Sequence, residues 1–124
     1  MKKLIAIPSQ NDGGLKDSIS GHFGHCSIYT IITVIDDEIE NVKTIPNIPH
    51  DQGGCIAPVQ LLKDHNVDTL IANGMGMRPL MHFKNMEIET FYAGEILPID
   101  EIIHAFIGGK FAPFDETFTC SGSK

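Results

Sequence analysis

The sequence predicts one α/β domain in which helices flank a mixed sheet of five strands. The first observation behind this prediction is the length, because 124 residues can bury one self-sufficient core but are too few for two independent domains. The second is the order of patterns along the chain. An apolar strand and a hairpin come first, and helical and strand patterns then alternate, without an internal repeat or a low-complexity linker.

The first half of the chain predicts three strands and two loops. Lys3–Pro8 is a short apolar run, typical of a strand that is covered on both faces. Residues 9–25 have no apolar period and form a long loop. The β-branched run Cys26–Ile35, an acidic turn and the segment Ile39–Pro46 then predict a hairpin. A second loop follows at residues 46–54.

The second half alternates between helix and strand. Its helices are predicted at residues 56–66, 79–85 and 98–107, and its strands at residues 67–72 and 87–92. Pro58 and Pro79 fall in first turns, where proline is tolerated, and a glycine pair follows the last helix. Residues 111–124 show no period, so we expect a domain over residues 1–110 and a flexible tail over residues 111–124.

This order of elements fixes which loops meet. The first and third strands of an antiparallel meander run in the same direction, and right-handed crossovers make the fourth and fifth strands parallel to the first. The loops after strands one, three, four and five therefore open at one edge of the sheet, where α/β proteins bind ligands. These loops are residues 9–25, 46–55, 73–78 and 93–98.

The charge of the chain excludes several classes of function. Sixteen acidic and nine basic residues give a net charge of −7, which repels a phosphate backbone and an anionic membrane. The apolar start is too short for a secretory signal, and no run approaches the roughly 18 residues of a membrane span. We therefore expect a soluble cytoplasmic protein that binds neither nucleic acid nor membrane.

Cysteines and histidines gather in the converging loops. The three cysteines, Cys26, Cys55 and Cys120, are an odd number in a reducing compartment, so they are free thiols or ligands rather than a disulfide framework. His22, Cys26 and Cys55 lie in, or at the mouth of, two of the loops. Thiolate and imidazole suit zinc, copper(I) and iron-sulfur species. Cys120 lies in the tail, where an uninvolved thiol is the simpler interpretation.

The two loop cysteines differ in their surroundings. Strand alternation places Cys26 on the same face as Ile32 and Val34, so it is either a ligand or a core thiol. Cys55 follows Gly54 and precedes a helix, whose dipole and free amides favour the thiolate, although a buried cap residue is the alternative.

The segment Asn73–Pro79 has the context of a phosphate-binding turn, because it follows a buried strand and opens a helix. A dinucleotide fingerprint would need a third glycine where Pro79 stands. Gly74 and Gly76 therefore indicate close approach of an anionic ligand, or only a tight turn. Nearby methionines either line this site or pack in the core. The motifs of common hydrolases are missing from the sequence.

Five segments carry a resemblance to a known family. They are Ile5–Pro8, Ser20–Gly24, Asn47 with Gly53–Cys55, Val67–Ile71 and Asn73–Leu80. Over residues 1–110 the chain resembles the dinitrogenase iron-molybdenum cofactor biosynthesis family, which includes nitrogenase accessory proteins of the NifX and NifB carboxyl-terminal type. The resemblance implies a ribonuclease H-like fold and the binding or carriage of a metal-sulfur cluster or its precursor, without catalysis. A nuclease is disfavoured, because residues 3–8 hold no carboxylate.

The leading hypothesis is a small carrier for an iron-sulfur, molybdenum-iron-sulfur or other heterometal-sulfur cluster, working with a cluster donor or recipient protein. Its metal ligands are Cys55 and His22, the histidine that the family has before Phe-Gly, with Cys26 as a third candidate. Amides near Gly54, Gly74 and Gly76, together with Arg78, would donate hydrogen bonds to the cluster. Zinc is a variant of this hypothesis. The alternatives are a binding module for a phosphorylated metabolite or nucleotide at the Gly74 turn, and a thiol enzyme using Cys55.

Overall fold

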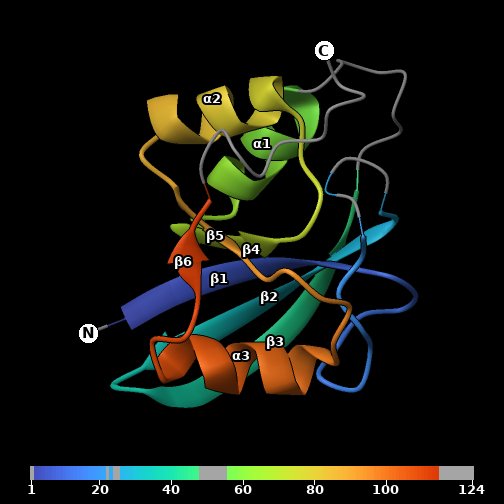
Figure 1. The fold of residues 1–124 in the computed structure, drawn as a ribbon, viewed down its shortest axis with the longest axis vertical. Helices are drawn as coiled ribbons and strands as arrows, with labels where there is room; N and C mark the ends of the chain where they lie inside the picture. The colour runs from blue at the N-terminus through green and yellow to red at the C-terminus, as the bar shows by residue number, and fades with distance from the viewer. Residues whose placement is uncertain (1, 22, 24–25, 48–55, 115–124) are drawn as a thin grey trace.

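The computed structural model of the protein describes residues 2–21, 23, 26–47 and 56–114. Within these ranges a central sheet has α1 and α2 on one face and α3 on the other (Figure 1). The elements, in chain order, are β1 (Lys2–Ser9), β2 (Ile28–Ile35), β3 (Glu38–Pro46), α1 (Ile56–Asp64), β4 (Thr69–Ala72), α2 (Met77–Asn85), β5 (Glu89–Tyr92), α3 (Ile99–Ile107) and β6 (Ala112–Pro113). None of these three helices is long and apolar enough to cross a lipid bilayer.

The strand order in the sheet is β3-β2-β1-β4-β5-β6. β2 pairs antiparallel with both β1 and β3, whereas β1 with β4 and β4 with β5 are parallel. These directions confirm the mixed sheet and the predicted topology, so the carboxyl ends of β1, β3, β4 and β5 share one edge. The ribonuclease H-like classification, which came from the resemblance, stays a prediction.

The prediction of five strands was wrong, because the described residues form six. The sixth strand, β6, pairs antiparallel with β5 inside the segment expected to be a flexible tail. The amide of Phe114 donates to the carbonyl of Thr90 at 2.8 Å, and its side chain is only 3% exposed. The packed body therefore continues through residue 114. A strand of two residues has no period that a sequence can display, which is why it escaped prediction.

Alternation along β1 divides the apolar side chains between two cores. Ala6 points into the core under α1 and α2, whereas Ile5 and Ile7 point into the core under α3. Both cores are covered by helices, which explains why the central strand reads as a continuous apolar run.

The tip of the β2–β3 hairpin is a two-residue turn. Ile35 pairs with Glu38, and the intervening Asp36 and Asp37 have positive φ angles of 51° and 68°. This is the backbone of a type I′ turn, whose twist matches that of the two strands. The acidic turn predicted from the sequence is thereby confirmed.

The loop after β1 is folded back on itself rather than irregular. Its outgoing and returning arms are joined by hydrogen bonds from Gln10 N to Ser18 O (3.0 Å) and from Ser20 N to Pro8 O (2.7 Å). The loop also supplies acceptors to the first turn of α3, whose amides have no partners within the helix. Ile99 N donates to the carbonyl of Asp17 (2.8 Å), and this hydrogen bond joins the loop to α3.

The carboxylate of Asp17 organises the loop. It accepts hydrogen bonds from Asn11 N (2.9 Å), Asn11 Nδ2 (3.1 Å), Gly13 N (2.8 Å) and Ser18 N (2.7 Å). Burial by itself raises the pKa of Asp17, but the hydrogen bonds outweigh burial and hold this pKa below its ordinary value. The loop therefore depends on the ionised form of one side chain.

Replacing Asp17 with asparagine should lower the free energy of unfolding by about 2 kcal/mol at neutral pH, because the new amide group would face backbone donors. The pKa of Asp17 is lower in the folded than in the unfolded protein, so its ionisation stabilises the fold above the unfolded pKa. That contribution disappears as the pH falls through the folded-state pKa. Urea unfolding of wild type and Asp17→Asn should show a difference that shrinks below pH 3.8. A difference that stays constant down to acid pH would contradict this account.

Two adjacent glycines of this loop provide a matched pair for a second test. Gly13 and Gly14 both have positive φ angles, of 82° and 92°. A Cβ atom at Gly13 would lie 2.6 Å from Cγ2 of Thr44, whereas a Cβ atom at Gly14 would meet nothing within 4 Å. Gly14→Ala should cost about 1 kcal/mol through backbone strain, and Gly13→Ala about 1 to 3 kcal/mol more through overpacking. Equal unfolding midpoints for the two variants would show that the loop does not pack on β3 in this way.

Candidate functional site

The site begins where the loop after β1 crosses the loop after β4. Phe23 N donates to the carbonyl of Gly74 at 2.7 Å, and Gly74 N donates to the carbonyl of Gly21 at 3.0 Å. Both polar groups of one glycine are thus used to hold the two loops together. Because of this pair, two motifs that are far apart in the sequence meet in space, one at Gly21 and Phe23 and the other at Gly74.

Phe23 anchors its side of the crossing in the core. Its ring lies 5.6 Å from the ring of Tyr29 and 5.1 Å, edge to face, from the ring of Phe83. Its carbonyl accepts hydrogen bonds from Tyr29 Oη (3.2 Å) and Cys26 Sγ (3.4 Å). The backbone at Gly21 and Phe23 is therefore fixed by packing of the Phe23 ring in the core and by hydrogen bonds to Gly74.

Cys26 is 7% exposed and lies in the core under α1 and α2. Burial raises the pKa of its thiol, which favours the neutral form. The expected face was wrong, because Cys26 packs with Tyr29 and Ile31 rather than with Ile32 and Val34. The strand begins only at Ile28, so the alternation does not extend back to residue 26.

The other two predicted loops join the same edge. Asn47 donates from its side chain to the carbonyl of Cys26 (2.8 Å) and from its backbone to Ser27 (2.8 Å), which ties the end of β3 to the start of β2. Asn73 donates from Nδ2 to the carbonyl of Glu95 at 2.9 Å, which ties the end of β4 to the loop after β5. Three of the four predicted loops thus meet at this edge, and the fourth begins there, at Pro46 and Asn47, which are the part of it that the structure describes.

The helix α2 begins at this crossing with its first turn uncapped. Gly76 is the N-cap residue, no side chain of the described residues makes a capping hydrogen bond, and no acidic residue lies in the first turn. Arg78, the only arginine of the chain, is exposed in that turn. First-turn amides, which have no acceptor within the helix, the positive end of a helix dipole and a guanidinium group together favour an anion here. The methionines near this turn differ in exposure, since Met75 is buried in the core whereas Met77 is exposed.

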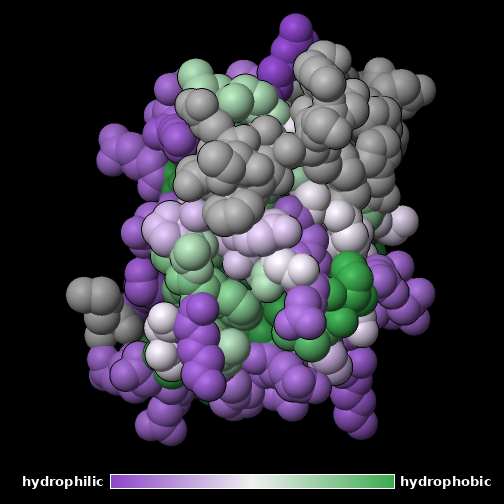
Figure 2. Space-filling view, in the orientation of Figure 1, coloured by the Kyte–Doolittle hydropathy of each residue, from purple (hydrophilic) through white to green (hydrophobic). Residues whose placement is uncertain are grey.

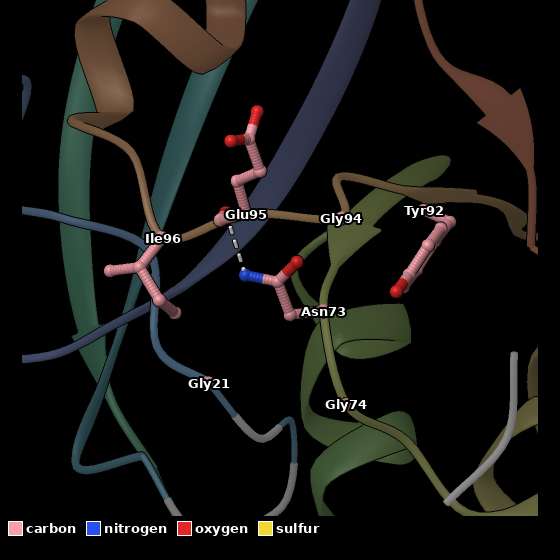
Figure 3. A pocket seen from close by; sticks show the side chains of 7 residues that line it. All are labelled: Gly21, Asn73, Gly74, Tyr92, Gly94, Glu95 and Ile96. Atoms are coloured by element: carbon pink, nitrogen blue, oxygen red, sulfur yellow. Dashed lines mark hydrogen bonds between the residues drawn. The ribbon is translucent and has the colours of Figure 1, made fainter.

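A pocket of about 340 Å³ lies beside the crossing (Figure 3). It is lined by Gly21, Asn73, Gly74, Tyr92, Gly94, Glu95 and Ile96. Three of these residues are glycines, and the hollow exists because they place no side chain in it. Tyr92 and Ile96 were not predicted as site residues, since neither belongs to a recognisable motif. The signal that could have found them was the position of residues 93–98 after a strand that ends at the same edge.

Several predicted site residues lie outside the described part of the chain. They are His22, Gly54 and Cys55, and Cys120 of the predicted tail also lies outside it. Within the described ranges, no three histidine, cysteine, aspartate or glutamate side chains come together as a group that could hold a metal ion. The ligand roles of His22, Cys26 and Cys55 therefore stay predictions.

Comparison with known proteins decides the family. The sequence pattern of a family described as dinitrogenase iron-molybdenum cofactor matches residues 1–109. The chain belongs to this family. The resemblance inferred from five segments of the sequence is thereby confirmed.

The relatives cover almost the whole length of the chain. An uncharacterized protein of Methanocaldococcus jannaschii is 28% identical over 113 residues, which are 90% of this chain and 91% of that protein. The solution structure of a Thermotoga protein assigned to NifB has 26% identity and a TM-score of 0.73, covering 90% of this chain and 92% of that one. The apo form of the orange protein from Desulfovibrio gigas shares the fold, with 16% identity and a TM-score of 0.76 over 91% of this chain and 97% of that one.

The burial of Cys26 leads to a testable prediction about its reactivity. In a variant that carries Cys55→Ser and Cys120→Ser, iodoacetamide should alkylate Cys26 at least about tenfold more slowly in the native than in the denatured protein, because its raised pKa suppresses the thiolate. The measurement is the rate of mass increase at mildly alkaline pH. Equal rates in the native and denatured protein would place this thiol at the surface.

Proposed function

We propose that this protein binds and carries a metal-sulfur cluster, of iron-sulfur or iron-molybdenum type, or a precursor of one. The observation that carries the proposal is the crossing at Gly74, which joins the loop bearing His22 to the uncapped start of α2. Membership of the iron-molybdenum cofactor family supports the class of cargo. The cluster is cargo in this proposal, so the protein binds and releases it rather than catalysing a reaction.

The charges around the crossing fit such a cargo. Metal-sulfur clusters with sulfide-rich faces are anionic, and the protein as a whole has a net charge of −7. An acidic protein can hold an anion only where local donors offset its own field. The amides at Gly76 and Met77 and the guanidinium group of Arg78 make the start of α2 such a place.

We propose Cys55 and His22 as the covalent ligands. A thiolate and an imidazole match the soft metals of these clusters. Gly54 would supply a further backbone amide beside the thiolate. Cys26 stands apart from this pair, because its thiol lies in the core and donates to a backbone carbonyl. As a third ligand it would first have to leave that environment and lose its proton.

The second candidate function is a binding module for a phosphorylated metabolite or nucleotide. The same uncapped turn favours it, because free amides and Arg78 suit a phosphate group as well as a sulfide face. The two candidates differ in what they require of Cys55 and His22, which a phosphate would not need. Zinc bound by the same thiolate and imidazole remains a variant of the first proposal. The cytoplasmic location and the donor or recipient protein stay predictions.

Anaerobic reconstitution with iron and sulfide should give the protein a visible chromophore. Cys55→Ala and His22→Ala should each reduce the iron bound per protein at least about tenfold, because each removes a ligand to the metal. Cys26→Ala should retain the chromophore. A colourless, metal-free wild-type protein would overturn the proposal, and phosphate-dependent thermal stabilisation that is lost in Arg78→Gln would favour the second candidate.

The matched control for the anion-binding turn lies on the same helix. Arg78 and Lys84 are both exposed on α2, one in its first turn and one in its last. Arg78→Gln and Lys84→Gln remove the same charge, but only Arg78→Gln should weaken cluster binding, because only Arg78 stands beside the free amides. Equal losses in iron content would show that net charge alone governs binding.

A further inference from the structure

The pocket beside Gly74 has a chemistry opposite to that of the α2 turn. Among the buried side-chain atoms of the described residues, Asn73 Oδ1 is the one that has no hydrogen-bond partner. Its identity as the oxygen is fixed, since the other end of the carboxamide donates to the carbonyl of Glu95 at 2.9 Å. A buried acceptor without a donor costs free energy, so an occupant that donates a hydrogen bond would be stabilising here.

The walls of the pocket also favour a positive charge. Asn73 is only 9% exposed, and Figure 3 shows its Oδ1 on the side of the carboxamide that faces Tyr92 and Gly94. The aromatic ring of Tyr92 attracts cations through its quadrupole. Glu95 also lines the pocket, but Figure 3 shows its exposed carboxylate pointing away from Asn73, so it adds negative potential near the pocket rather than a direct contact. An acceptor, an aromatic ring and a carboxylate attract a cationic donor and repel a sulfide face or a phosphate.

We propose that this pocket is a second binding site, which takes a primary ammonium group. A volume of about 340 Å³ accommodates an alkylammonium chain of a few carbons. The ammonium group would lie over Asn73, between Tyr92 and the backbone of Gly94, while the chain packs on Ile96. The same group can come from a small amine or from a lysine side chain of a partner protein.

The site adjoins the proposed cluster site without sharing its polar groups. Gly74 lines the pocket and is also the residue at which the two loops cross. Occupancy of the pocket by a lysine of a donor or recipient protein would therefore bring that protein next to the start of α2. The ammonium site itself does not depend on the proposed cargo, and it can be tested on protein that contains no cluster.

The test records ¹H–¹⁵N NMR spectra of the backbone amides of cluster-free protein. The probes, added separately, are n-butylammonium, Nα-acetyl-lysine amide, butyrate and inorganic phosphate. Both ammonium probes should shift the backbone amides of Gly21, Gly74 and Gly94, whereas Gly108 and Gly109, beyond α3, should not move. A stronger response to butylammonium assigns a small amine as the ligand, and a stronger response to the lysine derivative assigns a partner lysine. If butyrate or phosphate moves the same three glycines, or no probe moves them, the proposal is wrong.

Two variants and one control separate the pocket from general attraction to an acidic protein. Glu95→Gln should weaken binding of butylammonium about threefold, as expected for an exposed ion pair. Glu101→Gln, which removes the same charge from an exposed position on α3, should leave the affinity unchanged at physiological salt. Equal effects of these two substitutions would overturn the proposal.

The second variant narrows the pocket without strain. A Cβ atom at Gly21 would lie 3.7 Å from Cδ1 of Ile96, an ordinary contact, and the φ angle of Gly21 is not positive. Gly21→Ala should therefore fold normally and weaken the response to butylammonium, because the added methyl group takes up space against Ile96, where the alkyl chain is proposed to pack. Retention of the full response in a folded Gly21→Ala variant would place the probe elsewhere.

Discussion

The two backbone hydrogen bonds at Gly74 are the constraint on which the candidate site depends. One glycine uses its amide and its carbonyl to hold the residues on both sides of His22. The bond to Phe23 is reinforced by packing, because that ring contacts Tyr29 and Phe83 in the core. The loop that carries His22, a proposed ligand, is thereby fixed to the sheet at one point, while the rest of the loop is organised by Asp17. The positions of these loops at the sheet edge thus come from backbone hydrogen bonds rather than from the side chains of the candidate ligands.

Two proposed sites with opposite charge preferences lie close together at this edge of the sheet. Gly76 and Arg78 form a turn that favours anions, and Asn73 and Glu95 form a pocket that favours cations. Figure 2 shows one face of the molecule, with hydrophilic side chains around its margin and apolar patches in the middle. In a protein of net charge −7, an anion site needs such local compensation, whereas a cation site is assisted by the global field.

Most of the fold could be predicted because its long elements have strong periods. The apolar run of β1, the hairpin and the amphipathic α3 were each evident from the sequence, and their order fixed the strand directions. The elements that escaped prediction, or were placed on the wrong face, lack a period. β6 has two residues, and Cys26 is separated from the strand by a bend at Ser27, so alternation assigned it to the wrong core. The inner pairing of the loop after β1 depends on one buried carboxylate, for which no local pattern exists.

The sequence by itself determined that four loops meet at one edge and that Gly74, Gly76 and Arg78 form a turn at the start of a helix. Both follow from local chemistry and from the handedness of connections, which act on short stretches of chain. Only the tertiary structure decided that Gly74 is bonded to Gly21 and Phe23, that Cys26 is buried, and that Asn73 keeps an unpartnered oxygen beside Tyr92. These features join residues that are far apart in the chain. Their energies come from packing and hydrogen bonds that exist only when the whole sheet has formed.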